Sequence, residues 1–264
     1  MARLPERAVL FGGVYNNHLA LEALLSEAPA RAPRIFCLGD VGAFGPHPDR
    51  SVDLLREAGV PVVQGNYDRS VGMGRKDCAC GYTDPRDNHF AALSFEYTLR
   101  NTSDRNKEFL AALPAEIRLP GPRGERVLLC HGSPRRQNEF LWESLSPDRF
   151  LARLLDEARC DVLAVTHTGI PWKRLLPDGR LVVNVGAIGR PANDGRTEVW
   201  YAVLDLSGEA PDAELLPLPY DHARLAREMR DEGIVEPFVE TIETGWWTTC
   251  LEILPAKERG RGRF

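Results

Sequence analysis

Four polar residues that could bind a metal each follow a short apolar run of the sequence. They are Asp40, Asn66, His131 and His167, and the runs before them are residues 34–38, 62–64, 127–130 and 162–165. The apolar runs predict buried strands, and the carboxyl ends of strands in an open α/β sheet converge on one ligand crevice. If the four strands share a sheet, the four side chains meet at one point.

The combination of ligand types indicates which ion these residues would bind. One carboxylate, one amide oxygen and two imidazoles form a mixed oxygen and nitrogen set, which suits a divalent transition metal. The alternative is a loop carboxylate, a turn asparagine and two buried histidines that bond to backbone. Four such residues at four strand ends favour the metal site.

The bulk composition excludes several classes of protein. The chain has 264 residues, of which 43% are hydrophobic and 27% charged, which fits one large α/β domain or two small ones. A net charge of -5 gives no general attraction to nucleic acid or to anionic membranes. We see neither an apolar run long enough to span a membrane nor an export signal, so we expect a cytoplasmic protein whose six cysteines are reduced.

The hydrophobic pattern predicts alternating strands and helices, followed by antiparallel strands. Strands are expected at residues 8–11, 34–38, 60–64, 126–130, 161–165, 173–176, 181–185, 198–206 and 214–218. Helices are expected at residues 18–25, with Asn16 or Asn17 as N-cap, and at 49–58, 90–100, 103–113, 148–159, 221–232 and 241–254. Residues 72–88 predict a long loop, and residues 257–263 a basic tail.

The order of the short motifs around these residues resembles the calcineurin-like metallophosphoesterases. The matching motifs are Gly39-Asp40, Gly65-Asn66-Tyr67-Asp68, His131-Gly132, Thr166-His167-Thr168 and Asn184-Val185-Gly186, and the resemblance covers roughly residues 8–206. It implies an α/β (α+β) fold, a four-layer αββα sandwich of two mixed β-sheets flanked by helices. Residues 1–219 would form this domain, with a loop insertion at 72–88, and residues 220–264 a helical extension and basic tail packed on it.

The sequence departs from the family pattern at the ligands of one metal of the family's pair. The family's Asp-x-His-Gly-Asn corresponds to residues 13–17, where Gly13 and Tyr15 replace the aspartate and the first histidine. The family's Gly-His-x-His ends here in Gly169. Asp40, which the resemblance makes the bridging aspartate, remains, and so do the other three ligands of the second metal. Tyr67 also replaces an imidazole that could protonate a leaving group.

The resemblance therefore implies a metal-dependent phosphoesterase with an altered metal centre. One ion of manganese, iron, zinc or nickel would be held by Asp40, Asn66, His131 and His167, with His131 also serving catalysis. Hydrolysis of a phosphomonoester or phosphodiester would proceed through metal-bound hydroxide. The expected partner is a small phosphorylated molecule or a nucleotide. The rival hypothesis is a catalytically degenerate protein of the same fold that binds a phosphorylated ligand or a protein partner.

A second metal ion stays open at this point. Tyr15 could ligate a ferric ion as phenolate, although a tyrosine packed in a tight turn is favoured. Other side chains in reach of a rebuilt site are His18, His89, Asp87, Cys78 and Cys80. For the Cys78-Ala79-Cys80 motif, two free thiols are favoured ahead of a redox or metal role.

Further residues are candidates for binding the substrate or moving a proton. Tyr67 or Asp68 could assist proton transfer or orient a ligand. Arg135 and, with less support, Arg190 could hold a phosphate, against the alternative of solvated surface charges. Tyr15 and Asn17 lie where a phosphate could rest on a glycine-rich turn and the following helix N-terminus.

Overall fold

Two β-sheets packed face to face form the centre of the protein. The computed structural model describes residues 3–260. The first sheet has the strand order β2 (Ile35–Cys37), β1 (Arg7–Phe11), β8 (Val199–Asp205) and β9 (Asp212–Leu218). The second has the order β3 (Glu116–Pro120), β4 (Arg126–Cys130), β5 (Val162–Val165), β7 (Leu181–Asn184) and β6 (Trp172–Leu175).

Both sheets are mixed. In the first sheet β1 and β2 are parallel, while β8 pairs antiparallel with β1 and with β9. In the second sheet β4, β5 and β7 are parallel, and β3 and β6 are antiparallel edges. The carboxyl ends of β2, β4 and β5 are the strand ends that precede Asp40, His131 and His167, so the parallel pairs position the candidate ligands.

The central strands are apolar on both faces because both faces are covered. On β1, Ala8 and Leu10 pack between the two sheets, whereas the alternate residues Val9 and Phe11 pack against helices. This explains why β1 is a continuous apolar run rather than an alternating one.

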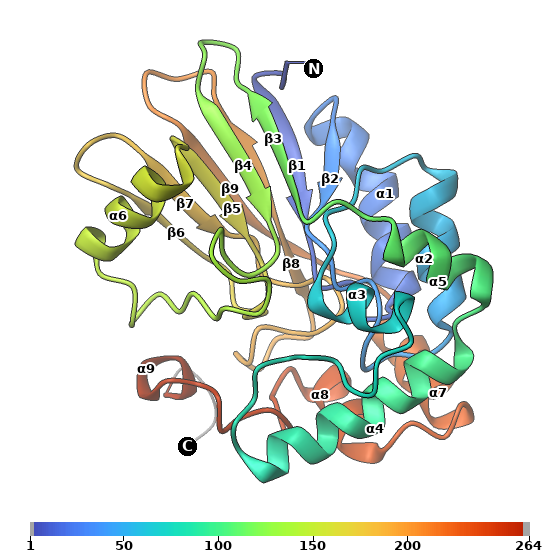
Figure 1. Ribbon diagram of the computed structural model, residues 1–264. Helices are drawn as coiled ribbons and strands as arrows, with labels where there is room; N and C mark the ends of the chain where they lie inside the picture. The colour runs from blue at the N-terminus through green and yellow to red at the C-terminus, as the bar shows by residue number, and fades with distance from the viewer. Residues whose placement is uncertain (1–2, 261–264) are drawn as a thin grey trace.

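Helices cover the outer faces of both sheets. The helices are α1 (His18–Arg31), α2 (Pro48–Glu57), α3 (Asn66–Gly72), α4 (Pro85–Asn101), α5 (Asp104–Ala111), α6 (Asp148–Ala158), α7 (His222–Asp231), α8 (Glu236–Thr244) and α9 (Ala256–Arg259). Figure 1 shows α6 on the outer face of the second sheet, with α1 and α2 on the opposite side of the molecule. The predicted four-layer sandwich of two mixed sheets flanked by helices is confirmed.

Several predicted boundaries were wrong. The loop predicted at 72–88 ends earlier, because Asp84 caps α4 by accepting a hydrogen bond from the Arg86 amide (2.8 Å) and Pro85 occupies its first turn. The strand expected at 60–64 makes only one bridge, between Cys37 and Val62. Helix α3 and edge strand β3 were not predicted.

The C-terminal part also differs from the predicted helix at 241–254. Helix α8 ends at Gly245, whose φ of 74° is readily adopted by glycine, and residues 246–254 then run without helix. In the predicted basic tail, residues 256–259 form α9, and residues 261–264 lie outside the described residues. Within residues 3–260, no helix is both long enough and apolar enough to cross a membrane.

Helices α7 and α8 pack against the start of α1. Leu19 of α1 lies among apolar side chains of the two helices, including Leu225 and Phe238. Next to this contact, Glu228 of α7 lies 3.2 Å from the Nε2 of the fully buried His18. The extension after residue 219 thus contacts the start of α1 through an apolar cluster with a polar group beside it, while the division at residue 219 stays a prediction.

His18 should make the protein less stable in mild acid. Burial, together with Arg50, His47 and Arg224, lowers the pKa of His18 to about 4, although Glu228 acts in the opposite direction. Between about pH 4 and the usual pKa of about 6.5, the unfolded chain binds a proton that the folded chain does not, so stability falls as pH falls. We expect thermal unfolding curves to show this loss, and His18→Gln to reduce it. An unchanged pH dependence in the variant would contradict the assignment.

Candidate metal centre

Asp40 sits in a backbone turn that a carboxylate from another segment holds in place. Its φ is 54°, in the left-handed region, directly after Gly39 with φ 87°. The carboxylate of Asp68 accepts hydrogen bonds from the amides of Asp40, Val41 and Gly65, each at 2.8 Å. These three bonds join the turn after β2 to the start of α3.

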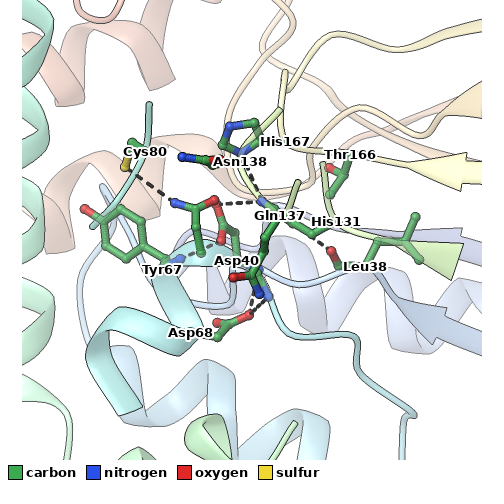
Figure 2. Close-up of polar contacts among 12 residues, drawn as sticks. Leu38, Asp40, Tyr67, Asp68, Cys80, His131, Gln137, Asn138, Thr166 and His167 are labelled. Atoms are coloured by element: carbon green, nitrogen blue, oxygen red, sulfur yellow. Dashed lines mark hydrogen bonds and ion pairs between the residues drawn. The ribbon is translucent and has the colours of Figure 1, made fainter. Parts of the chain in front are cut away.

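The side chains of Asp40, His131 and His167 converge at one buried point (Figure 2). His131 Nε2 lies 3.2 Å from Asp40 Oδ2 and 3.0 Å from His167 Nδ1. One potential ligand atom from each residue lies within 4.8 Å of those of the other two. All three residues are buried, so water does not compete strongly for these atoms.

The hydrogen bond on the far side of His131 decides what its Nε2 can do. His131 Nδ1 lies 2.8 Å from the Leu38 carbonyl oxygen, which can only accept, so Nδ1 carries a hydrogen. In neutral His131, Nε2 then carries a lone pair, which faces a carboxylate oxygen and a second imidazole nitrogen. A cation or a proton must lie among these atoms. Burial opposes the proton, yet the Asp40 carboxylate raises the pKa of His131 overall.

Asn66 supplies an oxygen that has no partner in the fold. Asn66 is the first residue of α3, and its Nδ2 donates to the Cys78 carbonyl oxygen at 2.9 Å. Its Oδ1 is buried and makes no hydrogen bond. A buried amide oxygen without a donor costs free energy unless a cation satisfies it. The donor set and this unpartnered oxygen together fit a transition metal ion.

His167 is held in place by contacts with two other segments. It also has a left-handed φ of 47°, and Asn184 of β7 donates to the Thr166 carbonyl (2.7 Å) and the Thr168 hydroxyl (2.8 Å) on either side of it. The Phe140 ring lies against the imidazole, with 4.3 Å between the ring centroids. Burial and His131 lower the pKa of His167 to about 3, which favours the neutral form that ligates a metal.

The residues predicted to move protons have structural partners. Asp68 is fully buried behind Asp40, and burial together with the Asp40 carboxylate raises its pKa to about 6. Its three backbone bonds make it a positioning residue. The Tyr67 amide donates to Asp40 Oδ1 at 3.0 Å, and its hydroxyl donates to Ser94 Oγ at 2.8 Å. Burial raises the pKa of Tyr67 well above its usual value.

The two residues expected at a phosphate-binding turn are buried at the start of α1. Asn17 is the N-cap as predicted, since its side chain accepts from the Ala20 amide at 3.0 Å, and its Nδ2 donates to the Ile188 carbonyl at 3.3 Å. Tyr15 packs edge-on against Phe44. Burial and the Asp40 carboxylate raise the pKa of Tyr15 far above its usual value, which favours phenol over phenolate.

The two candidate arginines bind other parts of the chain. Arg135 pairs with Glu139, and its guanidinium lies over the Phe150 ring. Arg190 is buried, donates to the Thr249 carbonyl at 2.6 Å, and stacks 3.8 Å from the centre of the Trp247 ring. Neither contact is to the ligand cluster, so phosphate binding by these arginines stays a prediction.

The cysteine motif next to the ligands is oxidised. Cys78 and Cys80 form a disulfide, so the expectation of two free thiols was wrong, while the other four cysteines are free and buried. The left-handed φ of 51° at Ala79 turns the chain so that the two Cα atoms lie 5.2 Å apart, within the range for a disulfide. The C-x-C spacing is compatible with both states.

The other side chains considered for a second metal lie elsewhere. His18 faces Glu228 of α7, and His89 is exposed beside Phe90. Asp87 accepts a hydrogen bond from the Ile253 amide at 3.0 Å. Among residues 3–260, Asp40, His131 and His167 are the only group of three or more His, Cys, Asp or Glu side chains that lie close enough together to hold one metal ion.

A small cavity adjoins the ligand cluster. Its lining includes Tyr15, Asp40, Tyr67, Cys80 and His167. Its volume of about 20 Å³ is enough for a water molecule or two beside Asp40.

The family model of the calcineurin-like phosphoesterase superfamily domain matches residues 11–209. The chain belongs to this superfamily. The matched segment includes all four predicted ligands. Three of them, Asp40, His131 and His167, lie close together in the structure.

Individual relatives agree with this assignment. An uncharacterized protein of Methanocaldococcus jannaschii is 28% identical over 207 residues, covering 73% of this chain and 79% of that protein. A crystal structure of a metallophosphoesterase from Sphaerobacter thermophilus is 25% identical with a TM-score of 0.70, covering 92% of this chain and 100% of that one. A hypothetical protein from Pyrococcus horikoshii OT3 has a TM-score of 0.77 at 17% identity, covering 93% and 100%.

Aromatic rings occupy the positions where this superfamily member lacks the second set of ligands. A Cβ on Gly13 would lie 2.9 Å from Cζ of Tyr15, so an aspartate there would collide with this ring. A Cβ on Gly169 would rest on the indole of Trp247, 3.5 Å from Cζ2. Trp247 comes from the segment that was predicted to be helical, and its indole donates to the Pro191 carbonyl at 2.6 Å. No motif in the sequence marked it as a site residue.

Replacing Asp68 should loosen the turn that carries Asp40. In Asp68→Asn the amide nitrogen cannot accept, so at least one of the three buried backbone N–H groups loses its partner. We expect a loss of about 2 kcal/mol in the free energy of unfolding, measured by urea denaturation at pH 7. Asp104→Asn is the control, because the Asp104 side chain is 98% exposed, and it should change stability by less than about 0.5 kcal/mol. Equal effects of the two substitutions would contradict this role of Asp68.

Proposed function

We propose that this protein is a metal-dependent phosphoesterase with a mononuclear centre, held by Asp40, Asn66, His131 and His167. The main support is the convergence of buried polar atoms on one point: His131 Nε2, His167 Nδ1 and Asp40 Oδ2, with Asn66 Oδ1 left without a hydrogen-bond donor. Membership of the superfamily supports a phosphoric ester as the substrate. The structure from Sphaerobacter thermophilus, described as a metallophosphoesterase, supports the same activity.

The bound ion would polarise the phosphate and, in favourable cases, lower the pKa of water to about 7. The chain's own residues orient the ligands for this. Leu38 fixes the tautomer of His131, and such outer partners of ligating histidines typically matter for metal affinity. The Tyr67 amide and Asp68 fix the two sides of Asp40.

The space around Asp40 supports the proposal of a single ion per chain. Tyr15 and Trp247 fill the positions from which the missing ligands would project, at Gly13 and Gly169. Tyr15 is favoured as phenol, which makes it a poor ligand. Manganese, iron, zinc and nickel all fit the remaining donor set.

The proposed substrate is a small phosphorylated molecule or a nucleotide, as a phosphomonoester or phosphodiester. Tyr67 lines the cavity beside Asp40 and could orient this ligand, although its hydroxyl is bonded to Ser94. The rival function is that of a catalytically degenerate protein of the same fold, which binds a phosphorylated ligand or a protein partner without turnover. The two rings beside Gly13 and Gly169 favour it, because they lie where the missing metal ligands would stand.

Removing one imidazole should separate these functions. We expect His131→Ala to weaken manganese binding by more than about 100-fold, because the lost group is a direct ligand and even outer-shell partners are worth 10–100-fold. It should also abolish turnover of aryl phosphate monoesters and diesters. His89→Ala, which changes an exposed histidine, should leave both unchanged. Wild-type protein that binds manganese but turns over no ester on a broad panel would support the binding function instead.

Metal stoichiometry tests the mononuclear centre directly. We expect protein saturated with manganese or zinc and passed through a desalting column to retain one equivalent, as measured by elemental analysis. His89→Ala and Asp87→Asn should retain the same amount, since neither side chain faces the ligand cluster. Two equivalents in the wild-type protein would contradict the proposal.

A further inference from the structure

A short loop between α3 and α4 closes over the metal ligands. We call residues 77–82 the strap. Cys78 and Cys80 of the strap are joined by a disulfide, and their side chains are 5% and 9% exposed. Cys80 and Tyr82 line the cavity that Asp40 and His167 also line. Figure 2 shows Cys80 on the same side of the cluster as Tyr67.

The strap holds Asn66, the candidate ligand whose side-chain oxygen has no hydrogen-bond partner. Asn66 Nδ2 donates to the Cys78 carbonyl oxygen at 2.9 Å and lies 3.6 Å from Cys80 Sγ. With its nitrogen bound on the strap side, Asn66 leaves its buried Oδ1 without a hydrogen-bond partner. The orientation of the amide, and so the availability of Oδ1 to an ion, depends on where Cys78 and Cys80 lie.

Two further hydrogen bonds fix the backbone of the strap at Ala79. Asn138 Nδ2, from the segment after β4, donates to the Ala79 carbonyl at 3.0 Å, and within the strap Asp77 accepts from the Ala79 amide at 2.9 Å. These bonds need Ala79 to keep its left-handed φ of 51°, which is unfavourable for alanine. The disulfide across Ala79 holds this conformation.

The disulfide contributes little as a stabilising crosslink. Its partners are separated by two positions in sequence, and the chain entropy removed by a crosslink falls as the closed loop becomes shorter. The four other cysteines are buried and unpaired. The pair at 78 and 80 is therefore placed to control local geometry at the ligands rather than global stability.

We propose that the Cys78–Cys80 disulfide is a redox-sensitive clasp on the metal centre. When it is closed, the strap fixes Asn66 with Oδ1 available to the ion. When it is reduced, Ala79 leaves its left-handed conformation, the hold on Asn66 loosens, and the ion binds more weakly. This inference rests on the proposed metal site and adds to it a modification that regulates metal loading.

The redox step is an ordinary thiol–disulfide exchange. A dithiol attacks one sulfur of the Cys78–Cys80 disulfide and then closes its own disulfide, so that two electrons and two protons pass to the protein as two thiols. A disulfide-containing oxidant reverses the step with the same balance. In the reduced protein both thiols are free, and Cys80 lies at the wall of the cavity.

Manganese affinity in the two redox states tests the clasp. We choose manganese because it prefers oxygen and nitrogen ligands to thiolates, so the freed thiols do not compete for it. The protein is measured after oxidation and after reduction with a phosphine that is then removed, with the state confirmed by mass spectrometry. We expect the dissociation constant to rise roughly tenfold on reduction and to recover on reoxidation, the lower end of what outer-shell partners contribute.

Two variants separate the clasp from other thiol effects. The double variant Cys78→Ser with Cys80→Ser should bind manganese weakly under both conditions and lose the redox response. Cys160→Ser, which removes a buried cysteine packed among residues of α6 and the second sheet, should keep it. Equal affinity of the oxidised and reduced wild-type protein overturns the clasp.

A second readout does not depend on metal. Hydrogen exchange of the amides of residues 77–82 should become faster on reduction of the metal-free wild-type protein, and exchange in α6 should not change. Unchanged exchange in the strap overturns the clasp even if manganese binds. Absence of manganese binding in both states, with faster exchange in the reduced strap, would instead overturn the metal site and the function proposed above.

Discussion

The geometry of the site depends on one buried carboxylate that does not face the ligand cluster. Asp68 accepts hydrogen bonds from three backbone amides, two after β2 and one before α3. These bonds hold Asp40 in the left-handed backbone conformation. Residues other than glycine adopt this conformation only where the surrounding contacts compensate for the strain. Because Asp40 is fixed in this way, the loops after β4 and β5 can bring two imidazoles to its carboxylate from the other sheet.

The same arrangement creates an electrostatic conflict in the interior. His131 Nε2 lies 3.2 Å from Asp40 Oδ2 and 3.0 Å from His167 Nδ1, yet the hydrogen of neutral His131 is on Nδ1, where it is donated to the Leu38 carbonyl. Because these atoms are buried, leaving them without a partner would cost free energy, and a bound cation would remove this cost. The positions of the ligands and their need for an ion therefore have a common origin in the fold.

Apolar strands that end in polar residues leave a clear local pattern, which was sufficient to predict residues that meet, although these strands belong to two sheets rather than to one shared sheet. Asp40, His131 and His167 were predicted on this ground. The layers were predicted from the family resemblance. The sequence was not sufficient for roles that depend on contacts between distant segments. The three backbone bonds of Asp68 could not be predicted, because two of their donors lie on a segment far from it in the sequence. The helix predicted at 241–254 included Trp247, because the prediction did not recognise that Gly245 ends α8.

The rings beside Gly13 and Gly169 make the altered centre hard to reverse. An aspartate at position 13 would meet Tyr15 at once, and it would also have to adopt a φ of 53°. A side chain at position 169 would lie against Trp247, whose indole is bonded to Pro191 and stacked on Arg190, and would have to adopt a φ of 71°. A paired-ion centre would therefore need several substitutions at once, since more than one ligand position has to change.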